Sequence, residues 1–460
     1  MDQSTKELQK ERNQIYYDLS RNTIPKRLPA GFSFPPHMVA EYGSIDPIEY
    51  SFNPASGERA AEELCDLVYS DTCPVYPVGI VSRPAQFYQI LQSRTFVMGT
   101  NGFVQHPEVA GMKETEYALL TEDPYAFILE KAIPRLYRAL DPSDPVRSLL
   151  ALQAAKAELD MMFQKSVPIV SKMTEKHGYF NGGVKGSSGF ISAPYDFIAD
   201  QLRSFSGISI DLRRRRSQLK EACEAVMPLM FHWGMPSNPD PQGKVGAPLH
   251  MPPYMKEKDF AEVWMPTFKT MTQQYAALGI RSSGFCEQDW MRYLDYLMDF
   301  PAGMQWMFEY GDAKIIKEKL GKKFILCGLY PISLIKMGTR QQCIDKAKEL
   351  LDIMMPGGGY LFAFDKDPLS LKDINLENYI AVAEFVRDYA VYQNAGASFG
   401  MKINSEGFKY DESLIPPVKS RYLQNWDEYK AMYPLTPDSA RADREQQEKE
   451  IMSFYLHLLT

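Results

Sequence analysis

The chain has 460 residues, of which 45% are hydrophobic and 24% are charged, as in an ordinary globular protein. Its net charge of −7 argues against the broad basic surface of a nucleic-acid-binding protein. No apolar run approaches the ~18 residues of a membrane span, and the polar N-terminus lacks a signal-peptide core. The six cysteines are irregularly spaced and do not suggest a disulfide framework, so we expect a soluble, cytoplasmic protein.

The first seventy residues are expected to form an extension. The segment before Pro25 has the pattern of a charged helix, and residues 28–54 are rich in proline, glycine and aromatic residues, which predicts an irregular segment. We therefore predict an N-terminal extension over residues 1–71 that wraps around a main domain formed by residues 72–460.

The next elements are mostly helical. A helix is expected over residues 60–69, and the β-branched run at 75–81 predicts a first strand. Residues 96–99 are a candidate second strand. Helical periodicity then dominates residues 123–140 and 145–163.

Two irregular stretches follow. Residues 178–194 are glycine-rich but lack the order of a phosphate-binding loop, and no clear strand precedes them, so we expect a flexible or closely packed loop. Residues 235–253 contain six prolines. A long irregular loop inside a compact fold is usually functional or a lid, and this stretch is expected to be one of the two.

From Asp259 onward, strands and helices are expected to alternate regularly. Such β-then-α repetition predicts a parallel sheet, and its length and continuity favour a single (β/α)8 barrel over an open Rossmann sheet. The expected strands cover 282–286, 304–308, 323–327 and 360–364, and the expected helices cover 260–278, 290–298, 313–320, 340–354 and 376–392.

Chemically reactive residues stand where these strands end, which is how a (β/α) barrel builds an active site. Cys286 and Glu287 end one strand, Cys327 ends another, and His250 follows the proline-rich stretch. Thiolate, carboxylate and imidazole ligands would suit a zinc ion, so His250, Glu287 and Cys327 are predicted ligands and Cys286 is a further candidate. The alternatives are core packing for the cysteines, a structural salt bridge for Glu287 and a simple loop histidine.

Further polar residues could take part in catalysis. Asp365 and Lys366 end the strand at 360–364 and could bind an anionic group or pair with each other. His106 could be a general acid or base, or equally a hydrogen-bonded structural histidine. Glu287, His106, Asp365 and Lys366 are therefore the candidate catalytic residues.

Aromatic side chains are abundant near the proposed site and could line a pocket for a flat substrate. Helical spacing would also explain several of them as core residues. The candidates for substrate binding are Tyr254, Trp264, Phe285, Trp290 and Tyr330.

The order of several segments resembles the uroporphyrinogen decarboxylase superfamily. Residues 260–268 (Phe-Ala-Glu-Val-Trp-Met-Pro-Thr-Phe) resemble the helix before the sixth strand of that family. Residues 320–328 with 334–339, and residues 357–364 with Glu377-Asn378, resemble its last two strand-and-helix elements. The match runs from about residue 72 to about residue 392 and implies a single (β/α)8 barrel.

The resemblance also implies a choice of chemistry. True decarboxylases of the family carry a Met-Arg-Gln-Ala-Gly-Arg sequence that is absent from the comparable residues 75–84. The coenzyme M methyltransferases carry His-x-Cys where this chain has Phe285 to Glu287, and a later cysteine near the position of Lys366. The remaining set of His250, Glu287 and Cys327, with Asp259 as a further candidate, resembles the variable metal sites of the ether-cleaving branch.

The resemblance therefore implies a methyltransferase of the O-demethylase type. Such an enzyme would move a methyl group from a methylated small molecule, such as a methoxylated aromatic, to the Co(I) of a separate corrinoid protein. It would use zinc and a cobalamin presented by that partner, bind neither nucleic acid nor membrane, and could form a homodimer. The alternatives are a decarboxylase or lyase of a polycarboxylate, which predicts an arginine-rich cavity, and a non-catalytic tetrapyrrole- or corrinoid-binding barrel.

Overall fold

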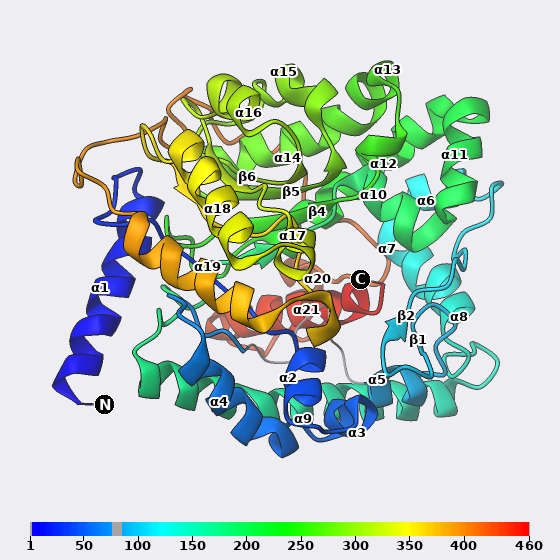
Figure 1. Ribbon diagram of the computed structural model, residues 1–460. Helices are drawn as coiled ribbons and strands as arrows, with labels where there is room; N and C mark the ends of the chain where they lie inside the picture. The colour runs from blue at the N-terminus through cyan, green and yellow to red at the C-terminus, as the bar shows by residue number, and fades with distance from the viewer. Residues whose placement is uncertain (1, 76–84, 460) are drawn as a thin grey trace.

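A six-stranded parallel sheet forms the centre of the protein (Figure 1). The computed structural model describes residues 2–75 and 85–459. The strands follow one another in chain order, and the sheet does not close into a barrel within these residues, so the predicted α/β class is confirmed but the eight-stranded closure is not. The strands are β3 (Gly189–Phe190), β4 (Val245–Leu249), β5 (Ser282–Asp289), β6 (Gln305–Tyr310), β7 (Ile325–Gly328) and β8 (Tyr360–Leu361).

The predicted alternation after Asp259 is confirmed. Two helices form with the bounds that the sequence predicts, and local signals explain why. The Asp312 side chain caps α16 (Ala313–Leu320), and Thr339 forms a capping box at the start of α18 (Arg340–Met354). The other helices between or after these strands are α14 (Met265–Ala277), α15 (Leu294–Leu297), α17 (Ile332–Met337) and α19 (Leu376–Tyr389).

The two faces of the sheet differ because successive side chains on a strand point to opposite sides. One face is fully buried in the main hydrophobic core and packs towards helices such as α14 and α16 (Figure 1). The opposite face carries mostly half-buried residues, with two buried residues on β7, and we call it the site face. It is formed by Gly246, Pro248, Ser283, Phe285, Glu287, Gln305, Met307, Glu309, Ile325, Cys327 and Leu361.

Both stretches that were predicted to be irregular are so over most of their length, but each contains a strand that the prediction missed. β3 lies in the glycine-rich stretch and β4 in the proline-rich one. Proline is tolerated at Pro248 because β3 pairs only with Val245 and Gly246, so no neighbour on that side needs the missing N–H group. Glycine and proline disfavour strands locally, so the sequence pattern did not predict β3 and β4. Both strands are stabilised by pairing with neighbouring strands.

The N-terminal segment is joined to the same core. After α1 (Gln3–Ser20), Ala30 forms a parallel bridge with Phe362 next to β8, and Phe34 forms one with Val75. Residue 75 is the first of the predicted strand at 75–81; the rest of that strand lies outside the described residues. The helices of this segment are α2 (Pro36–Tyr42), α3 (Pro47–Phe52) and α4 (Glu58–Leu67), and α4 confirms the helix expected near residues 60–69.

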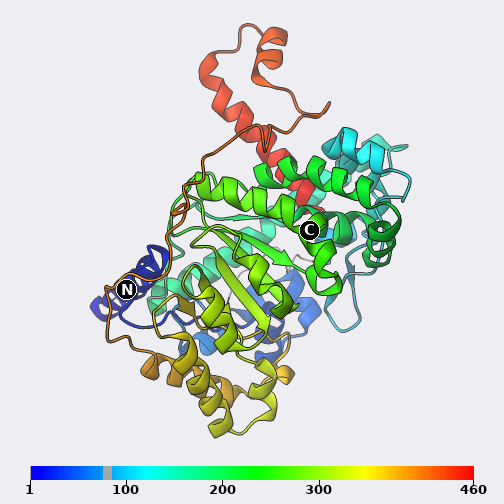
Figure 2. The same ribbon diagram turned by 90° about the horizontal axis from the view of Figure 1, so that it is seen from above.

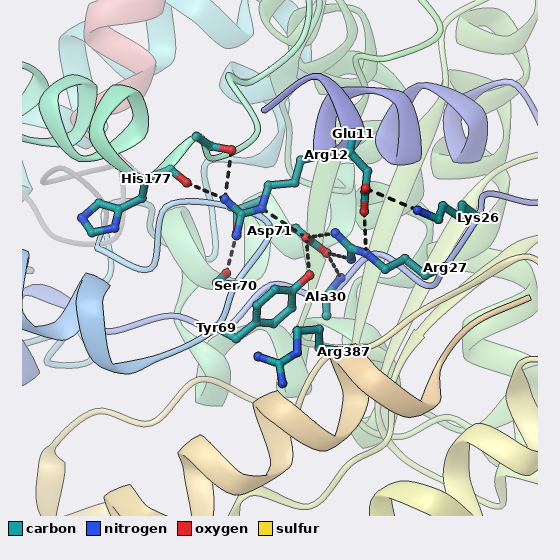
Figure 3. Close-up of polar contacts among 12 residues, drawn as sticks. Glu11, Arg12, Lys26, Arg27, Ala30, Tyr69, Ser70, Asp71, His177 and Arg387 are labelled. Carbon is teal, nitrogen blue, oxygen red and sulfur yellow. Dashed lines mark hydrogen bonds and ion pairs between the residues drawn. The ribbon is translucent and has the colours of Figure 1, made fainter. Parts of the chain in front are cut away.

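A buried ion cluster fixes this segment in place (Figure 3). Asp71 is fully buried and accepts two hydrogen bonds from Arg27, at 2.8 and 2.7 Å. It also accepts hydrogen bonds from the Ala30 backbone N–H and the Tyr69 hydroxyl, both at 2.9 Å. The Arg12 guanidinium lies 3.5 Å from the same carboxylate. This network ties α1 and the chain that follows it to the sheet.

Helices form most of the remaining structure. The strand expected at 96–99 is β1 (Val97–Met98), which pairs only with β2 (Val104–Gln105), outside the large sheet. In Figure 2 the C-terminal part runs out from the body before α21 returns to it. No helix among the described residues could cross a membrane. The other helices are α5 (Ala85–Ile90), α6 (Tyr117–Glu122), α7 (Pro124–Phe127), α8 (Ile133–Leu136), α9 (Pro145–His177), α10 (Pro194–Phe197), α11 (Phe205–Arg214), α12 (Arg216–Gly234), α13 (Glu257–Asp259), α20 (Trp426–Met432) and α21 (Arg441–His457).

Candidate functional site

His250 and Glu287 form a hydrogen-bonded pair at the carboxyl ends of two neighbouring strands. His250 directly follows β4, and the register Leu249 to Cys286 places Glu287 beside it on β5. The Nδ1 atom of His250 bonds to Oε2 of Glu287. Burial lowers the pKa of His250, but the hydrogen bond to Glu287 and the charge of Asp200 outweigh it and raise the pKa to about 9. His250 therefore carries a proton on both ring nitrogens at neutral pH.

Two more carboxyl groups lie close to His250. Asp196 is buried on α10, and Asp200 follows it in the π-helical turn Ile198–Arg203. The indole N–H of Trp264 donates a hydrogen bond of 2.9 Å to Oδ1 of Asp196. Burial and the neighbouring carboxylate raise the pKa of Asp196, and burial raises that of Asp200, although the charge of His250 opposes both shifts. These shifts favour the protonated form of Asp196 at neutral pH, so this group can also carry a proton near His250.

A second charged pair lies along the same edge of the sheet. Glu309, near the end of β6, accepts hydrogen bonds of 2.7 Å from the Gln288 backbone N–H and from the Lys366 ammonium group. The charge of Glu287 also raises the pKa of Lys366, after the larger effect of the bond to Glu309. The ammonium group of Lys366 therefore lies within electrostatic reach of the His250–Glu287 pair.

The backbone is strained at this edge. Gln288 has a φ of 58° directly after Glu287, and Leu329 has a φ of 74° directly after β7. Left-handed backbone is rare for a side chain as bulky as leucine, and such residues cluster at functional sites because the surroundings must hold them in place. The strain agrees with a site at the carboxyl edge.

A cavity of about 430 Å³ opens beside His250. His106 borders it, stacks on Phe96 with ring centroids 4.5 Å apart, and hydrogen-bonds to the Thr95 hydroxyl at 3.0 Å. Burial and the positive charge of His250 lower the pKa of His106, so the two histidines differ in charge at neutral pH. The described lining includes no arginine or lysine; it consists of His106, Pro107, Glu108, Val109, Asp200, Gln201, Ser204, Phe205 and His250.

Several of the predicted catalytic residues lie along this edge. His250, Glu287 and Lys366 are coupled through the contacts described above, and His106 borders the same cavity as His250. Asp365 lies next to Lys366 and accepts hydrogen bonds from the backbone N–H groups of Ile332 and Lys366, at 3.0 and 2.8 Å. Burial raises the pKa of Asp365.

The predicted zinc ligands do not form one shell. Cys286 points into the hydrophobic core on the opposite face of β5, and Asp259 is paired with Arg216. Cys327 is buried on β7, and burial raises the pKa of its thiol to about 12, which disfavours the thiolate that zinc binds. In the described parts of the chain, no group of three or more His, Cys, Asp or Glu side chains could hold a metal ion. The residues present do not fit the predicted zinc site.

The predicted aromatic residues divide into two groups. The Tyr254 hydroxyl bonds to Gln288, and its ring packs edge-on against Phe205 of the cavity at 4.9 Å between centroids. Trp264 and Trp290 are fully buried and do not face the cavity. Their indole N–H groups donate hydrogen bonds to the Asp196 carboxylate and to the Glu287 carbonyl oxygen, and so hold these two residues in place.

The other two aromatic candidates have different surroundings. Tyr330 is fully buried and donates a hydrogen bond of 2.9 Å to the Cys343 carbonyl, so it does not face an open cavity. Phe285 is half-buried on the site face, two residues before Glu287, and is placed where it could contact a ligand.

The sequence prediction missed three acidic residues. Glu309 directly follows the strand expected at 304–308, so the signal that identified Glu287 would also have identified it. Asp196 and Asp200 follow β3, which the glycine-rich sequence concealed. A strand has to be recognised before an acid that follows it can be placed at the edge of a sheet.

Comparison with protein-family models and with curated proteins finds no match to this chain.

Proposed function

We propose that the protein is a methyltransferase that takes a methyl group from a methoxylated aromatic compound and passes it to a corrinoid protein. The observation that carries the proposal is the protonated His250 at the carboxyl edge of a parallel sheet, hydrogen-bonded to Glu287 beside a cavity. The sequence resemblance to ether-cleaving enzymes with the same expected α/β architecture supports it.

The chemistry of ether cleavage requires a proton donor. When the C–O bond of a methyl ether breaks, its electron pair stays on the oxygen, which must be protonated to leave as a phenol. The corrinoid, when bound, supplies the Co(I) nucleophile that accepts the methyl group. Nδ1 of His250 is occupied by Glu287, which leaves the Nε2 proton available for the ether oxygen in the cavity.

Neighbouring residues keep this donor ready. Glu287 fixes the orientation of the His250 ring, and the carboxyl groups of Asp196 and Asp200 favour its protonated form. After one proton has been given, the same acids could restore it. In this arrangement the leaving group is activated by a proton from His250.

The lining of the cavity favours this reaction over the decarboxylase alternative. A polycarboxylate needs several cationic partners, whereas the described lining next to His250 offers Glu108 and Asp200 and no arginine or lysine. A neutral ether is the better match to that part of the site.

Incubation of the protein with guaiacol and chemically reduced free cobalamin tests the proposal. We expect methylcobalamin to form, as followed by its visible absorption spectrum. We expect His250→Gln to lower the rate by about 10²–10⁴-fold, the usual contribution of general acid catalysis. A matched control is His232→Gln, because His232 bonds to the Pro416 carbonyl away from this edge. No transfer from any methyl ether, or an equal loss in both variants, would contradict the proposal.

A further inference from the structure

The first half of α9 exposes large apolar side chains to water. Four of them are between 45% and 69% exposed: Val146, Leu149, Leu150 and Met161. The opposite side of the same half packs on the body of the protein, where Ala155, Glu158 and Met162 are buried. A surface helix usually turns polar residues to water, and exposed apolar side chains are common singly but not in groups. The outer side of α9 therefore has the composition of a contact surface.

The exposed apolar residues form a continuous strip. Residues three or four apart lie on the same face of a helix, and such a row runs along the first half of α9. We call it the α9 strip, and it consists of Val146, Leu150, Ala154, Ala157 and Met161, all of them exposed. At 1.5 Å per residue the strip is about 22 Å long. α9 runs along the lower edge of the molecule in Figure 1, where a second molecule can reach it.

The order of side-chain sizes along the strip is complementary to its own reverse. In an antiparallel pair related by a two-fold axis between residues 153 and 154, Val146 of one copy faces Met161 of the other. Leu150 then faces Ala157, so a large side chain meets a small one and the two surfaces interdigitate. The two Ala154 side chains lie beside the axis, where their small size lets the helices approach closely. The strip can therefore pack against a second copy of itself.

The charges around the strip also fit a second copy. The strip itself carries no charged residue. The charged residues beside it pair within α9, where Arg147 lies 3.6 Å from Asp144 and Lys156 lies 2.5 Å from Asp160. Two copies would thus meet without like charges face to face. The flanks have neither the cationic excess that favours an anionic membrane nor an unpaired charge that calls for an oppositely charged partner.

The area of the strip is sufficient for a weak dimer. With Leu149 beside it, the strip offers on the order of 500 Å² of apolar surface per copy, at roughly 100 Å² for each large side chain. Two copies would bury about 1,000 Å² in total, which is the lower limit of a specific interface. A dimer held by this contact should dissociate in the micromolar range.

We propose that the α9 strip is the interface of a homodimer, in which two copies of the chain pack their α9 helices antiparallel about a two-fold axis. A two-fold contact requires one surface that complements itself, and the strip meets this condition in shape, charge and area. The dimer does not depend on the proposed function, because no α9 residue belongs to the described lining of the cavity beside His250.

Disulfide cross-linking tests the register of the two helices. Ala154→Cys places two thiols beside the axis, whereas the control Lys165→Cys, at another exposed position of α9, places them about 35 Å apart along the helices. The natural cysteines are buried except for the half-buried Cys73, so the wild type should not cross-link. On oxidation we expect Ala154→Cys to give a covalent dimer on a non-reducing gel, and Lys165→Cys and the wild type to remain single chains.

Sedimentation equilibrium measures the affinity. Leu150→Glu should raise the dissociation constant of the dimer by about 100-fold, because each dimer contains two copies of the substituted position. The matched control is Leu435→Glu, since Leu435 is 97% exposed and lies outside α9. It should dimerise like the wild type. Circular dichroism of both variants should match the wild type, because neither leucine belongs to the buried core.

Three results would overturn the proposed dimer. The first is a wild-type protein that stays monomeric up to about 100 µM. The second is a dimer that Leu150→Glu leaves intact, or in which Ala154→Cys does not cross-link. The third is a monomer that binds lipid vesicles and loses this binding in Leu150→Glu, which would make the strip a membrane contact.

Discussion

Replacement of Glu287 by glutamine should lower the pKa of His250. The substitution keeps the size of the side chain but removes the charge that, through its hydrogen bond, makes the largest contribution to raising this pKa. The remaining effects are burial, which lowers the pKa, and the two nearby aspartates, which raise it. We expect the pKa to fall from about 9 towards the ordinary histidine value near 6.5.

The consequence for catalysis depends on pH in a defined way. At pH 7 a pKa of about 9 leaves about 99% of His250 protonated, whereas a pKa near 6.5 leaves about 24%. At pH 8 the two values are about 91% and 3%. If His250 is the proton donor, the ratio of wild-type to variant rates should rise from about 4 at pH 7 to about 30 at pH 8. Methylcobalamin formation at a series of pH values measures this ratio.

The shift has a matching effect on stability. Because the pKa of folded His250 lies above its value in the unfolded chain, its contribution to the free energy of unfolding is fully present below about pH 6.5. That contribution disappears as the pH rises through about 9. The difference in denaturation midpoint between wild type and Glu287→Gln should therefore be larger at pH 6 than at pH 10.

NMR titration of labelled imidazole groups measures the pKa itself, independently of any activity. The chain has only six histidines, and His250→Gln assigns the signal of interest. Glu309→Gln is the control, because this carboxylate lies at the same edge but bonds to Lys366 and Gln288. A His250 pKa that is the same in Glu287→Gln as in the wild type, or a rate ratio that does not change with pH, would refute the reasoning.

Two further predictions concern stability. Asp71→Asn removes the buried counter-charge of Arg27, which then keeps only the partly exposed Glu11, and should lower the free energy of unfolding by about 3–5 kcal/mol, whereas Glu63→Gln, in an exposed pair, should cost less than about 1 kcal/mol. Denaturant unfolding of both variants measures this difference, and equal effects would contradict it. Gly328→Ala should destabilise by about 1–3 kcal/mol or more, because φ is 86° and the new Cβ would lie 2.4 Å from the Phe308 carbonyl oxygen. A thermal midpoint as high as that of the wild type would show that the strand end can relax.

The sequence was most informative where local signals and hydrophobic periodicity agreed. The bounds of α16 and α18 follow from capping residues next to amphipathic runs, which act within a few residues of the chain. The strands β5 to β7 follow from short apolar runs between those helices. These interactions are local, so they can be read without knowing the rest of the fold.

The sequence was least informative where long-range pairing determined the structure. β3 and β4 contain glycine and proline and become strands because neighbouring strands pair with them. With β3 unrecognised, Asp196 and Asp200 could not be placed near His250. The sequence also did not decide which of Cys286 and Glu287 faces the site. The structure shows that Cys286 lies in the hydrophobic core and that Glu287 bonds to His250.

The sequence by itself determined that the chain forms an α/β protein with a parallel sheet and that reactive residues end its strands. Hydrophobic periodicity fixes these features because it encodes which side of each element is buried. Only the tertiary structure decided which reactive residues meet. Convergence depends on strand register and on contacts between segments far apart in the chain. For that reason Cys286, Cys327 and Asp259 do not join His250 and Glu287, which instead form a proton-donating cluster with two unforeseen aspartates.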